Sequence, residues 1–115
     1  MVPKLFVYGT LAPGRPNEHV LAPLRGSWQP ATVKGRLNPE GWGADMGYPG
    51  LVLDPDGDDV HGLVFSSDRL AGFWTELDAF EGEEYERVLT WARLRDGTAT
   101  EAYVYVIRWP RLTAP

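Results

Sequence analysis

The chain has 115 residues, of which 43% are apolar and 23% charged, and its net charge is −5. This length suits one globular domain, residues 1–115, and the negative charge argues against binding to nucleic acid or to an anionic membrane surface. The absence of cysteine excludes disulfides and cysteine-ligated zinc, no stretch is long enough for a membrane span, and the lack of a signal-peptide pattern favours a cytoplasmic location.

The first half of the chain predicts strands with little helix. Lys4–Gly9 is apolar at almost every position, which is typical of a strand that is buried on both faces. A short helical turn is expected over Asn17–Leu21, where Pro23 ends it. Trp28–Leu37 is the next predicted strand, and Pro30 excludes a central position in the sheet for its early part.

Two β-hairpins are predicted from turn residues between apolar runs. Leu51–Leu53 and Val60–Phe65 flank the acidic turn "DPDGDD", whose aspartate spacing does not fit an EF-hand calcium loop and indicates a solvated turn. Tyr85–Leu94 and Thr98–Trp109 flank Asp96-Gly97, a favoured two-residue turn. Strands therefore make up most of the expected structure.

One segment, "SSDRLAGFWTELDAFEG", has a helical period. Ser67 is the expected N-cap, and Gly82 is the expected end of the helix. One helix among many strands predicts an α+β domain, in which a curved sheet or small barrel packs against this helix. The apolar residues that recur at steps of three and four are Leu70, Phe73, Trp74, Leu77 and Phe80.

Glu81 continues the apolar face of the predicted helix, because it lies four residues after Leu77. A carboxylate on a buried face is unfavourable unless it is hydrogen-bonded, paired or used in chemistry. The alternative is a frayed last turn from which the side chain of Glu81 reaches water. The pattern alone leaves both interpretations open.

Five motifs follow one another along the chain: "FVYGTLAPG" at Phe6–Gly14, "YPGLV" at Tyr48–Val52, "HGLVF" at His61–Phe65, "LDAFEG" at Leu77–Gly82 and "YER" at Tyr85–Arg87. Together and in this order they resemble the gamma-glutamylcyclotransferase family. The resemblance is closest to its small bacterial members and to the gamma-glutamylamine cyclotransferases. It implies a small mixed β-barrel with flanking helices.

The resemblance implies an intramolecular aminolysis, in which the α-amine of a γ-glutamyl group attacks its own γ-carbonyl and 5-oxoproline is released. The substrate is a small γ-glutamyl compound, and no metal or other cofactor is expected. The family's glutamate falls on Glu81, which would act first as base and then as acid. Its ligand-binding loop falls on Tyr8, Gly9, Thr10 and Leu11, where a glycine lets backbone N–H groups approach a carboxylate or oxyanion.

Further candidates each have a plainer explanation. Tyr85 matches a family tyrosine and lines the pocket, or it is a core aromatic residue at the start of a strand. Arg87 orients a carboxylate of the substrate, or forms a structural ion pair. Tyr48 belongs to a pocket wall or only to a turn. The two histidines, His19 and His61, have no neighbouring pattern of metal ligands, so no metal site is predicted.

Two departures from the family pattern bear on the substrate. The segment Pro39–Gly47 is longer and richer in glycine than its counterpart in compact relatives, and the ending "RWPRLTAP" lacks a Ser-Gly-Asp-Trp-like sequence. Neither identifies the leaving amine. A non-catalytic module that binds a small carboxylate is the alternative function, and a purely structural domain would need neither Glu81 nor the loop. A monomer or weak homodimer is expected.

Overall fold

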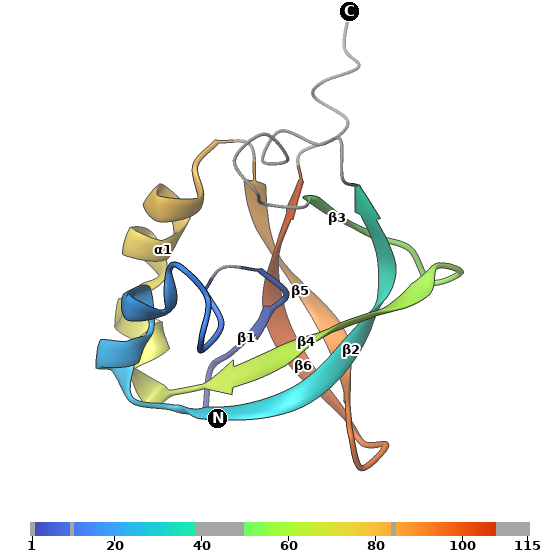
Figure 1. Cartoon of the computed structure of the whole chain (residues 1–115), viewed down its shortest axis with the longest axis horizontal. Coiled ribbons are helices and arrows are strands. Elements are labelled where there is room, and N and C mark those ends of the chain that lie inside the picture. The colour runs from blue at the N-terminus through green and yellow to red at the C-terminus, as the bar shows by residue number, and fades with distance from the viewer. Residues whose placement is uncertain (1, 10, 39–49, 84, 108–115) are drawn as a thin grey trace, which may run out of the picture.

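The computed structural model describes residues 2–9, 11–38, 50–83 and 85–107. Its six-stranded sheet has the order β3-β2-β4-β1-β6-β5, and an additional pairing of β2 with β5 closes five of the strands into a barrel (Figure 1). The predicted α+β class with a small mixed barrel is confirmed. The strands are β1 (Lys4–Val7), β2 (Ser27–Asn38), β3 (Gly50–Leu53), β4 (Asp58–Ser66), β5 (Tyr85–Leu94) and β6 (Ala99–Ile107).

Strand β1 lies between β4 and β6 and makes the barrel mixed. It pairs with β4 in the antiparallel sense and with β6 in the parallel sense, at Leu5 opposite Tyr103. Leu5 and Val7 enter one core cluster and Phe6 enters the other. Because successive side chains point to opposite faces, a strand buried on both sides is apolar at consecutive positions, which here are Leu5, Phe6 and Val7. The strand ends at Val7, two residues earlier than predicted.

The two core clusters divide the molecule into a barrel interior and a helix-covered side. The first cluster comes from strands and includes small residues such as Ala31, Ala92 and Ala102 beside larger ones, as is common in the interior of a small barrel. The second cluster joins the outside of the barrel to the helical segments and includes Leu70 and Leu77. These segments are α1 (Trp74–Glu81) and the 3-10 helices η1 (Glu18–Val20), η2 (Ala22–Leu24) and η4 (Asp68–Gly72), on one side of the barrel (Figure 1).

The predicted single helix is wrong in its first half. Ser67 is the expected cap, since its hydroxyl accepts a hydrogen bond from the Arg69 N–H at 3.1 Å, but it begins the 3-10 helix η4 rather than an α-helix. Phe73, with φ −119° and ψ −1°, separates η4 from the eight-residue α1. The expected apolar face is also shorter than predicted, because Phe80 is 43% exposed.

The first predicted hairpin is wrong, although its turn is present. The Gly57 N–H donates to the Asp54 carbonyl at 2.9 Å, but β3 and β4 both pair with β2 and not with each other. Gly35 of β2 lies opposite both Leu53, the last residue of β3, and Asp58, the first residue of β4. The turn between them therefore projects from the sheet, and β3 and β4 pair one after the other with β2. Pairing with β2 joins distant parts of the chain, and a local turn signal does not encode it.

The second predicted hairpin is confirmed as the pair β5 and β6, with a longer turn. The Leu94 N–H donates to the Thr98 carbonyl at 2.8 Å, which leaves three residues in the loop rather than two. Gly97 has φ +91°, a conformation that glycine adopts readily. Pro30 also lies as predicted, because β2 pairs with β5 only from Ala31 onward.

Candidate functional site

Glu81 is the last residue of α1, and the helix ends there for a local reason. Gly82 has φ +90°, and its N–H donates to the Asp78 carbonyl at 3.1 Å. The Glu81 side chain is partly buried at this helix end. Burial raises the pKa of the Glu81 carboxyl from its ordinary value of 4.5 to about 7. Of the two interpretations from the sequence, the structure has the partly buried carboxylate rather than a side chain in open water.

Two tyrosines lie close enough to Glu81 to interact with it electrostatically. The Tyr8 hydroxyl donates to the backbone carbonyl of Tyr105 at 2.7 Å, and the Tyr105 hydroxyl donates to Oδ1 of Asp78, also at 2.7 Å. Burial, followed by the charges of Tyr85 and Glu81, raises the pKa of Tyr8. Burial, followed by its hydrogen bond to Asp78, raises the pKa of Tyr105. Both phenols therefore stay protonated near neutral pH.

The direction of these hydrogen bonds matters for Glu81. A phenol carries a single proton, and Tyr8 and Tyr105 give theirs to a carbonyl and to Asp78. Neither phenol donates to the Glu81 carboxylate in this arrangement. A hydrogen-bond donor to Glu81 would stabilise its ionised form and lower its pKa. Because the Tyr8 and Tyr105 hydroxyls donate to other acceptors, they do not oppose the raised pKa of Glu81.

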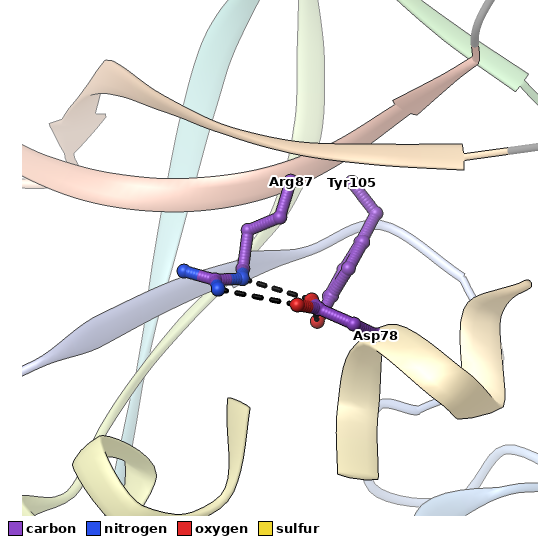
Figure 2. Close-up of polar contacts among 3 residues, drawn as sticks. All are labelled: Asp78, Arg87 and Tyr105. Carbon is purple, nitrogen blue, oxygen red and sulfur yellow. Dashed lines mark hydrogen bonds and ion pairs between the residues drawn. The ribbon is translucent and has the colours of Figure 1, made fainter. Parts of the chain in front are cut away.

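Asp78, three residues before Glu81 in α1, is the centre of a polar cluster with Arg87 and Tyr105 (Figure 2). Arg87 donates to its carboxylate twice, from Nε to Oδ1 at 2.9 Å and from Nη2 to Oδ2 at 3.2 Å. The guanidinium also lies over the rings of Trp74 and Tyr103, 4.5 Å and 4.9 Å from their centroids. The hydrogen-bonded guanidinium holds the pKa of the Asp78 carboxyl below its usual value. Arg87 thus has the structural ion pair that was one of its two predicted roles.

The predicted binding loop is described in part. Gly9 does not have a left-handed φ, and a Cβ built on it would have no described atom within 4 Å. The described part of the fold therefore does not require glycine there. Leu11 is 6% exposed and packs in the core cluster on the helix-covered side. Thr10 and Tyr48, like the segment 39–47, lie outside the described residues.

Tyr85 is buried in the core, which was one of its two predicted interpretations, and its place in the wall of a substrate pocket stays a prediction. It is 8% exposed and belongs to the core cluster that also contains Leu77. It also interacts electrostatically with Tyr8 and lines a surface hollow of about 410 Å³. Glu81 is not among the residues that line this hollow, although its chain neighbour Gly82 is. The hollow is lined by Asp78, Ala79, Gly82, Glu83, Tyr85, Glu86, Arg87 and Tyr105.

Sequence reasoning missed Asp78 and Tyr105. Asp78 is part of "LDAFEG" and precedes Glu81 by three residues, a spacing that places both on neighbouring positions of a helix surface. Tyr105 was visible only as one of the alternating apolar residues of a strand. Their contact joins α1 to β6, 27 residues later in the chain.

Among the described residues, no group of three or more His, Asp or Glu side chains could hold a metal ion. Within the same residues, no helix has the length and apolar character needed to cross a bilayer.

The family model for gamma-glutamyl cyclotransferase, AIG2-like, matches residues 5–114. The chain belongs to this family. The match includes both the loop that follows β1 and the end of α1. None of the curated protein sequences matches the chain significantly.

Solved structures of family type have the same fold. YkqA from Bacillus subtilis is 28% identical with a TM-score of 0.72; the alignment covers 94% of this chain but 36% of YkqA. The chain thus spans about a third of that protein. An AIG2-like protein from Mus musculus, named A2LD1 or GGACT, is 25% identical with a TM-score of 0.72, over 99% of this chain and 84% of the mouse protein. At5g39720.1 from Arabidopsis thaliana is 27% identical with a TM-score of 0.66, over 96% and 82%.

Proposed function

We propose that this protein is a gamma-glutamyl cyclotransferase that releases 5-oxoproline from a γ-glutamyl amine or γ-glutamyl amino acid, with Glu81 as the proton-transfer group. The observation that carries the proposal is the partly buried Glu81 carboxyl, whose pKa is raised to about 7 beside Tyr8. Membership of the family supports the type of reaction. A group that must take a proton and later return it works best with a pKa near the working pH.

The reaction needs one base, one acid and an oxyanion site. The Glu81 carboxylate takes a proton from the α-ammonium of the substrate, and the free amine attacks the γ-carbonyl carbon. The tetrahedral intermediate then collapses as the C–N bond to the leaving amine breaks. Glu81 returns its proton to the leaving nitrogen, and the ring nitrogen gives up its second proton, which the departing amine takes up, so that 5-oxoproline and a protonated amine are the products and the enzyme is regenerated.

The loop of Tyr8, Gly9, Thr10 and Leu11 is our proposed anion site. Open space at the Gly9 Cβ position supports this role, because the glycine has no explanation in conformation or in packing against described atoms. Backbone N–H groups in such a loop would stabilise the developing oxyanion. Tyr8 and the buried Leu11 anchor the two ends of the loop to the barrel.

A panel of γ-glutamyl amino acids and γ-glutamylamines, assayed for 5-oxoproline, tests the proposal. Glu81→Gln should bind 5-oxoproline normally and lose turnover by ~10²–10⁴-fold, the range expected for general acid–base catalysis. Glu76→Gln is the matched control, because Glu76 is an exposed glutamate on the same helix.

Turnover at the wild-type rate by Glu81→Gln would refute the assigned role. Saturable binding of γ-glutamyl compounds by the wild type, without release of 5-oxoproline, would select the alternative of a carboxylate-binding module.

A further inference from the structure

The last turn of α1 has little apolar contact to hold it on the barrel. Leu77 is the buried residue of the helix, and the three residues after it, Asp78, Ala79 and Phe80, are exposed. A helix of eight residues is not stable by itself in water, so its end depends on contacts with the rest of the fold. Glu81 follows directly, and its position depends on how this turn is held.

Asp78 supplies the contacts that the apolar face lacks. Its carboxylate receives three hydrogen bonds, two from Arg87 on β5 and one from Tyr105 on β6, at 2.7–3.2 Å (Figure 2). Two parallel N–H···O bonds from a guanidinium fix the orientation of a carboxylate as well as its distance. The Arg87 side chain is itself held over Trp74 and Tyr103.

Tyr105 also connects this anchor to the opposite side of the site. Its hydroxyl donates to Asp78, while its backbone carbonyl accepts the hydroxyl of Tyr8. A single residue of β6 thus contacts both the helix that carries Glu81 and the tyrosine that begins the proposed binding loop. A shift of the helix end relative to β6 would change the distance between Glu81 and that loop.

We propose that Asp78 is a positioning residue, which holds the last turn of α1 against Arg87 and Tyr105 and so fixes the Glu81 carboxylate relative to Tyr8. The proposal rests on the proposed function for its kinetic consequence. Its structural part, the fixed helix end, can be tested without turnover.

The geometry favours positioning over a contribution to global stability. The side chains of Asp78 and Arg87 are 46% and 23% exposed, so solvent screens their attraction and limits what the pair contributes to the free energy of unfolding. A misplacement of about 1 Å can nevertheless cost ~10²-fold in rate. Loss of Asp78 should therefore reduce kcat far more than thermal stability.

The test compares Asp78→Ala with Asp59→Ala. Asp59 forms an exposed ion pair with Lys34 at 2.7 Å on the β2–β4 ladder, so its loss controls for the removal of a surface ion pair. We expect kcat to fall ~10–100-fold in Asp78→Ala and to stay at the wild-type value in Asp59→Ala, with similar small changes in Tm for both. Asp78→Asn, which keeps an acceptor for Tyr105, should recover part of the rate.

Amide hydrogen exchange reads the helix end directly. The Gly82 N–H bonds to the Asp78 backbone carbonyl at 3.1 Å, so its protection reports the closed last turn. Asp78→Ala should accelerate its exchange, and Asp59→Ala should not. Tyr105→Phe removes the hydrogen bond to Asp78 but leaves the Asp78–Arg87 ion pair, so it tests the helix contact without changing any charge. It should also accelerate exchange of the Gly82 N–H and lower kcat.

Wild-type exchange at Gly82 in both Asp78→Ala and Tyr105→Phe would overturn the proposal, as would a wild-type kcat in both. If the wild type turns over no γ-glutamyl compound, the proposed function fails, while the exchange experiment still decides the role of Asp78. Should Asp78→Ala not fold, Asp78→Asn and Tyr105→Phe carry the same comparison.

Discussion

Replacing Glu81 by glutamine should change the pH dependence of stability in a defined direction. The pKa of the carboxyl is about 7 in the folded protein and 4.5 when unperturbed, so the folded state binds more protons between these values. Stability conferred by the neutral carboxyl is fully present below pH 4.5 and is lost as the pH rises to about 7. Glutamine does not titrate, so the variant should not show this loss.

The size of the effect follows from the raised pKa. One pKa unit corresponds to about 1.4 kcal/mol, which gives an upper bound of about 3 kcal/mol for the cost of the ionised Glu81. Because the side chain is only partly buried, solvent screening reduces our expectation to about 1–2 kcal/mol. For a chain of 115 residues this corresponds to a gain in Tm of roughly 4–8 °C for Glu81→Gln at pH 8 relative to pH 4.

Thermal unfolding of the wild type, Glu81→Gln and Glu76→Gln from pH 4 to pH 8 measures this difference. The difference in Tm between wild type and Glu81→Gln is compared at pH 4 and at pH 8, because this comparison cancels the constant effect of inserting an amide. A difference in Tm that does not depend on pH would show that Glu81 has an ordinary pKa, and the argument for its burial would then be wrong.

Tyr85→Phe should change kcat/KM by roughly the net value of a hydrogen bond, ~0.5–1.5 kcal/mol, with little change in Tm; lowered stability with unchanged kinetics would assign Tyr85 to the core alone. Gly9→Ala should fold normally, because its Cβ would meet no described atom, but should weaken binding of 5-oxoproline measured by calorimetry. Gly62→Ala should unfold at a markedly lower temperature, since its Cβ would meet the Val7 carbonyl and the Phe6 ring; wild-type melting would contradict the packing described.

The part of the candidate site that lies within one short segment, the end of α1, could be predicted from the sequence. Glu81 follows Leu77 by one helical turn, and Gly82 ends the helix, so a carboxylate at the edge of an apolar face could be inferred from spacing alone. Its partners could not be inferred in this way. Tyr105 reaches Asp78 across 27 positions of sequence, and nothing in either segment indicates the other.

The sequence by itself determined the class of the fold, the burial of β1 on both faces and the hairpin of β5 and β6, because apolar periodicity and turn residues act within a few positions. The tertiary structure alone decided that β3 and β4 both follow β2, that the predicted helix divides at Phe73, and that Asp78 rather than the apolar stripe holds the end of α1. Each of these depends on which distant strand lies beside a segment, and the free energy of that packing outweighs local preference.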